Sequence, residues 1–181
     1  MTATSVWAGV IVSSLDDALP WYREVTGVGV AESGEGWAVL RFPDGSGFEL
    51  CEGDPSTPGL VFPSYGADGG PPVMPGFAVE DVEAVLPGLT VARTLPGWVV
   101  VVAPGGLRVV LTEQDAKAGE GLVGFEITCP QREELVAFCE HVGATVVINE
   151  PGALRVVPVV RGRRDADVTD PDGNLVRLVS R

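Results

Sequence analysis

Residues 6–27, VWAGVIVSSLDDALPWYREVTG, join an apolar strand pattern directly to a short helix pattern. Ser14 is a good helix N-cap with Asp17 three positions later, and Gly27 is a suitable C-terminal stop. Because Pro20 lacks an N–H, we expect a loose first turn, with the regular helix beginning at Pro20. The stretch therefore predicts a strand followed by a helix at the start of the chain.

The same order of strand, helix and further strands recurs twice more along the chain. The first copy closes on a Pro-Asp-Gly turn at 43–45, the second runs from Val73 to Leu111, and the third runs from Leu122 to Leu178. Internal repetition indicates a fold built from repeated units. We predict an α+β protein in which each unit holds one strand, one helix and two or three more strands.

The composition is typical of a soluble globular protein that is strongly acidic. The 181 residues carry 12 Lys and Arg against 25 Asp and Glu, a formal charge of −13. Nucleic acid and anionic membranes need a basic protein surface, so neither is an expected partner. No apolar run approaches the roughly 20 residues of a membrane span, and the N-terminus does not resemble a signal peptide, so we expect a cytoplasmic protein. The three cysteines lack metal-ligand spacing and are expected to be reduced.

Two segments separate the repeats. The first is a loop rich in Pro and Gly at 53–71, in which Tyr65 would either cover a ligand or pin the loop to the core. The second is a polar linker at 113–120. We therefore divide the chain into a two-module domain at 1–113, made of residues 1–52 and 72–113, and a third module at 121–181.

Three motifs resemble the vicinal oxygen chelate superfamily, which includes glyoxalase I, extradiol dioxygenases and the fosfomycin and bleomycin resistance proteins. They are residues 14–27, FAVEDV at 77–82 and DPDGNLVRL at 170–178. The resemblance implies that each repeat is a βαβββ module and that two modules pair into a curled-sheet cup, which holds a divalent metal and the substrate. Residues 1–113 would then be a glyoxalase-like domain.

An odd number of modules leaves the third without a partner in this scheme. Its apolar sheet face would be exposed, which is unfavourable in water. We therefore predict a homodimer in which the third module pairs across the twofold axis. A weaker alternative is that the third module folds back and covers the first cup within the monomer.

The resemblance also implies a His early in the first strand of a module and a Glu in its last strand as metal ligands. Counted in register, the Glu position falls on Glu49, Val110 and Arg177. The His position falls on Trp7 and Met74 and, in the third repeat, on Leu122, Val123 or Gly124. The chain's single histidine, His141, ends the third predicted helix and is a poor ligand candidate. We therefore predict no metal and no other cofactor.

Bulky apolar side chains are expected to take the place of the metal ligands in the cup. They would either line a pocket for an apolar or aromatic molecule or simply fill the cup. Glu49 is either a general base or hydrogen-bond acceptor in that pocket, or a residue at the edge of the sheet that is solvated or paired with Arg41. The candidate ligand-binding residues are Trp7, Trp37, Glu49, Tyr65, Met74 and Trp98.

The favoured function is metal-free binding of a small natural product or drug-like molecule, as in the drug-binding members that the chain resembles, with antibiotic resistance as one outcome. Two enzymatic alternatives stay open. One is a metal-independent isomerase or cyclase that uses Glu49 as its base. The other is a metal-dependent lyase, isomerase or dioxygenase with an atypical ligand set.

Overall fold

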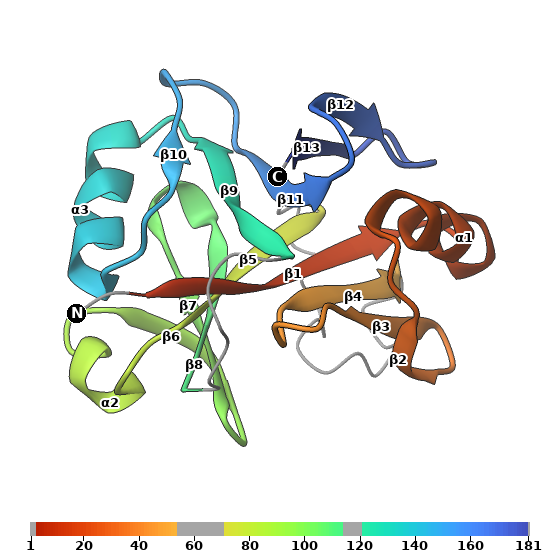
Figure 1. Ribbon diagram of the computed structural model, residues 1–181. Helices are drawn as coiled ribbons and strands as arrows, with labels where there is room; N and C mark the ends of the chain where they lie inside the picture. The colour runs from red at the N-terminus through yellow and green to blue at the C-terminus, as the bar shows by residue number, and fades with distance from the viewer. Residues whose placement is uncertain (1–2, 54–70, 114–120, 181) are drawn as a thin grey trace.

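The computed structural model describes residues 3–53, 71–113 and 121–180. Their strands form two sheets, one of eight strands and one of five (Figure 1). No helix within these ranges is long and apolar enough to cross a membrane.

The first two repeats form one continuous sheet in the order β2-β3-β4-β1-β5-β8-β7-β6. Its halves join where β1 pairs antiparallel with β5, and in each half the last strand runs parallel to the first. The predicted pairing of the first two modules is confirmed. The strands are β1 (Thr4–Val12), β2 (Val30–Gly34), β3 (Trp37–Arg41), β4 (Gly47–Glu52), β5 (Val73–Ala78), β6 (Thr90–Leu95), β7 (Trp98–Val102) and β8 (Arg108–Thr112).

Helix α1 (Leu15–Thr26) begins earlier than expected. The Ser14 hydroxyl accepts from the Asp17 N–H at 3.3 Å, and the Leu15 N–H donates to Glu52 Oε1 at 2.9 Å. Because these contacts satisfy two N–H groups of the first turn, the helix starts there. Pro20 lies inside the helix, so the predicted start at Pro20 is wrong.

The other helices follow their sequence signals. Asp81 caps the short helix α2 (Val82–Val85) through the Ala84 N–H, and η1 (Pro104–Gly106) is a single 3₁₀ turn. Helix α3 (Arg132–Val142) ends at Gly143, whose φ of 77° is left-handed. One face of α3 is apolar and buried; it comprises Leu135, Phe138, Cys139 and Val142.

The third repeat forms the second sheet, in the order β10-β9-β11-β13-β12. The directions of its neighbouring strands alternate as in β4-β1-β5-β8-β7 of the first sheet: parallel, antiparallel, parallel, antiparallel. The second sheet is therefore a shortened copy of the centre of the first, in which β11 corresponds to β5 and runs into β12 without a helix. Its strands are β9 (Leu122–Thr128), β10 (Val147–Ile148), β11 (Arg155–Gly162), β12 (Ala166–Thr169) and β13 (Leu175–Ser180).

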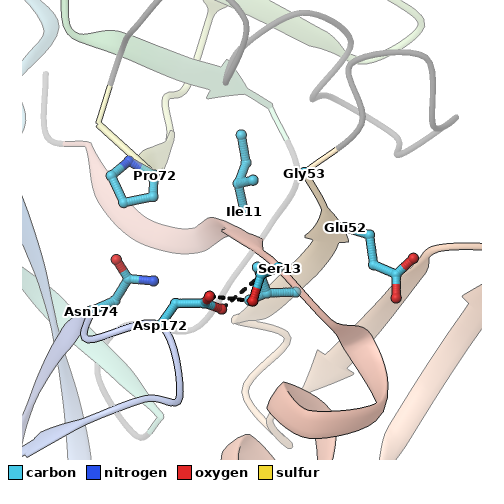
Figure 2. Close-up of a pocket in the computed structure, with 8 residues that line it drawn as sticks. Ile11, Ser13, Glu52, Gly53, Pro72, Asp172 and Asn174 are labelled. Atoms are coloured by element: carbon cyan, nitrogen blue, oxygen red, sulfur yellow. Dashed lines mark hydrogen bonds between the residues drawn. The ribbon is translucent and has the colours of Figure 1, made fainter.

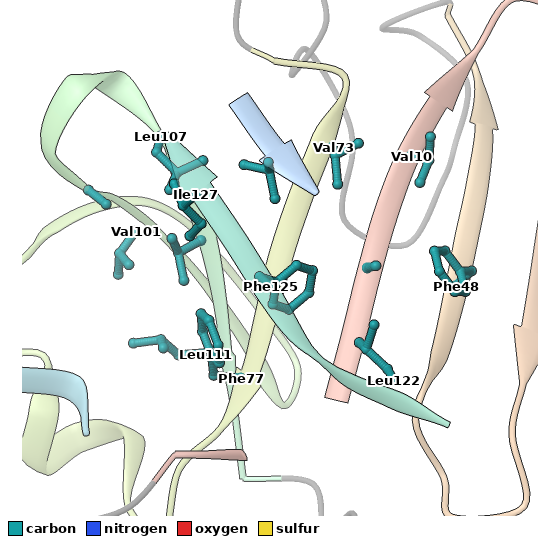
Figure 3. Packing of buried hydrophobic residues seen from close by; sticks show 14 of the residues in the cluster. Val10, Phe48, Val73, Phe77, Val101, Leu107, Leu111, Leu122, Phe125 and Ile127 are labelled. Carbon is teal, nitrogen blue, oxygen red and sulfur yellow. The ribbon is translucent and has the colours of Figure 1, made fainter. Parts of the chain in front are cut away.

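The apolar face of the second sheet packs against the first sheet in the same chain (Figure 3). Phe125 of β9 meets Phe77 of β5 edge to face, with ring centroids 5.7 Å apart. Leu122 and Ile127 join the same core cluster. Because this face is buried within the chain, its expected exposure is wrong and no longer supports a dimer. The homodimer itself stays a prediction.

Two buried carboxylates form hydrogen bonds between the first repeat and the third repeat. Asp44, in the turn before β4, accepts from the Gly121 N–H at 2.9 Å, just before β9. Asp170, in the turn before β13, accepts from the Tyr22 hydroxyl of α1 at 2.8 Å. Asp170 also accepts from the backbone N–H groups of Asp172 and Asn174, which fixes its own turn. Two of the motifs that carried the resemblance therefore meet in space.

Candidate functional site: the tryptophan face

The two faces of the first sheet carry different side chains. On β1, Ala8 and Val10 belong to the main core beneath the second sheet, whereas Trp7 and Ile11 belong to a separate cluster on the opposite face. This opposite face is named the tryptophan face. Its members include Trp7, Ile11, Trp37, Cys51, Met74, Trp98, Val100 and Val110. The third module therefore does fold back within the chain, as the alternative held, but it covers the face opposite the predicted cup.

The structure brings together the apolar candidate residues that it describes. Trp7 and Trp98 meet edge to face with ring centroids 5.8 Å apart. Trp7 lies close over Gly76, where an added Cβ would come within 3.0 Å of the Trp7 side chain. Met74 is fully buried, whereas Trp37 and Trp98 are half-buried and reach solvent. Tyr65 lies outside the described residues.

Glu49 of β4 lies on the tryptophan face with its side chain fully buried. Phe48 and Leu50 point into the main core, so the intervening Glu49 points the other way, as Cys51 does. The Cys51 thiol lies 3.7 Å from Glu49 Oε1. Burial raises the pKa of Cys51, and the negative charge of Glu49 raises it further. Because the exposed fraction of Glu49 is 0%, its interpretation as a solvated edge residue is wrong.

Arg41, the predicted partner in that interpretation, forms an ion pair with Glu32 of β2 at 3.3 Å. Both side chains lie at the exposed edge of the sheet, where such a pair contributes little to stability. Arg41 therefore pairs with Glu32, whereas Glu49 is a carboxylate buried on the tryptophan face.

The residues of this face do not fit the metal site that the resemblance implies. The ligand positions hold the indole of Trp7, the thioether of Met74, the alkyl group of Val110 and the carboxylate of Glu49. Borderline divalent metals need several nitrogen, oxygen or thiolate donors, and three of these four side chains supply none. Within the described ranges, no group of three His, Cys, Asp or Glu side chains is placed to hold a metal ion.

The remaining predicted positions have structural partners. The His141 Nε2–H donates to the Val85 carbonyl oxygen at 2.8 Å and so joins α3 to α2, which confirms its placement at a helix end. Arg177 of β13 forms ion pairs with Glu126 and Asp167. Its hydrogen bond to Asp167 raises the pKa of Arg177 and lowers that of Asp167.

An open pocket of about 590 Å³ lies at the end of β1, beside the tryptophan face (Figure 2). Its described lining comprises Ile11, Val12, Ser13, Glu52, Gly53, Pro72, Asp172 and Asn174. Ile11 belongs to both, because it lines the pocket and packs against the tryptophan cluster. Sequence reasoning missed this pocket. The Asp-Pro-Asp-Gly-Asn motif was its only signal, since Asp172 and Asn174 come from it.

Comparison with solved structures places this geometry in a known fold. An extradiol ring-cleaving dioxygenase from B. fuscum superimposes with a TM-score of 0.71 at 12% identity, over 99% of this chain and 72% of that chain. The Mn(II)-bound glyoxalase from Novosphingobium aromaticivorans gives a TM-score of 0.69 at 13% identity, over 99% of this chain and 81% of that one. BphC, a halotolerant catechol dioxygenase, gives 0.66 at 13%, over 100% and 87%.

Comparison at the level of sequence gives no match: neither a family model nor a curated protein matches this chain. At these identities the superpositions concern the fold, and function has to come from the site. The chain has the vicinal oxygen chelate fold, with an eight-stranded sheet and a shortened second sheet.

Proposed function

We propose that this protein binds a small aromatic or apolar molecule on the tryptophan face without using a metal ion. The observation that carries the proposal is the replacement of the metal-ligand positions by Trp7 and Met74, with Trp98 in contact with Trp7 and a single carboxylate, Glu49, on the same face. The similar solved structures include dioxygenases and a Mn(II)-bound glyoxalase, whereas the implied ligand positions of this chain do not fit a divalent metal.

The chemistry of the face suits an apolar ligand. Ligand sites are mostly apolar and carry a few polar groups that fix orientation. Here the half-buried Trp37 and Trp98 expose part of their aromatic rings to solvent. The buried Met74 adds a polarisable thioether to the same face. Glu49 supplies a carboxylate on the same face, where its side chain lies fully buried.

The test uses 2-(1-naphthyl)ethanol as a neutral aromatic probe, titrated calorimetrically in buffer that contains EDTA. We expect saturable binding with one site per chain. Trp98→Ala removes the exposed ring of the face and is expected to weaken binding about tenfold, since aromatic contact and lost area together amount to roughly 1.4 kcal/mol.

Trp21→Ala is the matched control. Trp21 is also half-buried, but it lies on α1 against Tyr22, with ring centroids 4.8 Å apart. This variant should bind the probe like the parent protein. Absence of binding to the probe and to a panel of larger aromatic compounds would contradict the proposal. Binding that appears only after Mn²⁺ or Fe²⁺ is added would favour the metal-dependent alternative instead.

A further inference from the structure

We infer that the ligand carries a protonated amine next to its aromatic body, and that the amine occupies the pocket at the end of β1. This inference rests on the proposed function, because it assigns a chemical class to the ligand of the tryptophan face. It adds a second part to that site, made of residues from both halves of the chain.

The pocket and the tryptophan face are continuous through one strand. Ile11 packs against the tryptophan cluster and also lines the pocket, and its register partner on β4 is Cys51. The next residue on β4, Glu52, lines the pocket as well. Figure 2 shows Ile11 among the side chains that line the pocket. A ligand whose ring lies on the tryptophan face can therefore extend a polar group past Ile11 into the pocket.

Both carboxylates of the pocket are held in place by backbone N–H groups. Glu52 Oε1 accepts from the Leu15 N–H at 2.9 Å, and Asp172 Oδ2 accepts from the Ser13 N–H at 3.0 Å. Each carboxylate oxygen can accept more than one hydrogen bond, so these contacts leave acceptor capacity for an ammonium group. The site is thus arranged before the ligand arrives, which lowers the entropic cost of binding.

The charges of the pocket favour a cation over an anion. Its described lining contains Glu52 and Asp172 but no Lys or Arg. Glu49 lies two residues before Cys51 on the same face of β4, and the whole chain has a formal charge of −13. Ile11 and Pro72 add apolar contact, and about 590 Å³ lies within the range of small-molecule sites. A protonated amine is attracted by these carboxylates, whereas a carboxylate ligand is repelled.

The experiment compares three probes of one shape on the full chain: 2-(1-naphthyl)ethylamine, 2-(1-naphthyl)ethanol and 3-(1-naphthyl)propionate. We expect the amine to bind at least tenfold more tightly than the acid, with the alcohol between them. We also expect the preference for the amine to shrink at high salt, because both pocket carboxylates are near solvent.

Two double variants test whether the preference for the amine probe arises from the pocket carboxylates. Glu52→Gln with Asp172→Asn keeps the hydrogen-bond acceptors and removes two charges, so it should abolish the preference for the amine while the alcohol still binds. Glu134→Gln with Glu140→Gln removes two exposed charges from α3 and should keep the preference.

The failures are distinguishable. Equal affinity for all three probes overturns the inference and leaves the proposed function standing. No binding of any of the three probes, or of the panel of larger aromatic compounds, overturns the proposed function and the inference with it. An equal loss of preference in both double variants overturns the assignment to the pocket, because overall charge then explains it.

Discussion

Tyr22→Phe tests how the second half of the chain is held against the first. The substitution removes only the hydroxyl that donates to Asp170 Oδ2 at 2.8 Å. The ring contact with Phe48, at a centroid distance of 5.4 Å, is retained by Phe. Both Tyr22 and Asp170 are buried, so water does not replace the lost donor at low cost.

The expected loss follows from the type of bond. A hydrogen bond to a charged acceptor contributes roughly 1.5–3 kcal/mol. Asp170 keeps the N–H donors of Asp172 and Asn174, so we expect the lower half of that range, about 2 kcal/mol. For a chain of this size, that loss corresponds to a fall in Tm of roughly 4–8 °C.

The assay is urea and thermal unfolding followed by far-UV circular dichroism, with a double-mutant cycle that includes Asp170→Asn. We expect a coupling energy of about 1–2 kcal/mol between the two positions, since they share the bond. A Tyr22→Phe protein within about 0.5 kcal/mol of the parent, or a coupling energy near zero, would refute the reasoning that this contact fastens the turn before β13 to α1.

Three further outcomes are expected. Gly121→Ala should destabilise the fold by about 1–3 kcal/mol in urea unfolding, because the added Cβ would lie 2.2 Å from the Phe42 ring. Gly124→Ala is the control, and it should change stability little because there is open space around Gly124. Burial raises the pKa of Cys139 to about 11 from its usual 9.0, so the folded state keeps a proton that the unfolded state releases. The contribution of Cys139 to the free energy of unfolding should therefore be constant below about pH 9 and fall between pH 9 and 11. Over that range the parent protein should lose more stability than Cys139→Ala, and an equal loss in both proteins would contradict the assignment. Gly76→Ala should displace the Trp7 ring, because an added Cβ would approach the Trp7 side chain to 3.0 Å. This displacement should shift the tryptophan fluorescence emission and weaken binding of the naphthyl probe. An unchanged spectrum and an unchanged affinity would count against the close packing of Trp7 on Gly76.

Local patterns predicted most of the first sheet. The register implied by the resemblance placed Trp7 and Met74 on one face with Glu49, because side-chain direction in a strand depends only on register. The caps at Ser14 and Gly27 also followed from local chemistry. Helix α1 nevertheless began earlier than Pro20 indicated, since Glu52, distant in sequence, stabilises its first turn.

The second sheet and the pocket depend on contacts between distant segments. The antiparallel pairing of β11 with β9 and its parallel pairing with β13 are properties of the whole sheet. The same holds for the pocket, where Glu52 and Asp172 meet only because the turn before β13 lies against the end of β1. Repetition in sequence therefore predicted the kind of unit, but not that the third repeat would form a shortened copy of the centre of the two-module sheet.

Metal-free binding of a small aromatic molecule is tested most directly by native mass spectrometry of the untagged protein. The protein is first incubated with Mn²⁺ and Zn²⁺, exchanged into ammonium acetate, and then mixed with 2-(1-naphthyl)ethanol. We expect a chain without stoichiometric metal that gains one probe molecule, and the same adduct after treatment with EDTA. One divalent ion retained per chain, and lost in Glu49→Gln, would contradict this reading and identify the tryptophan face as a metal site.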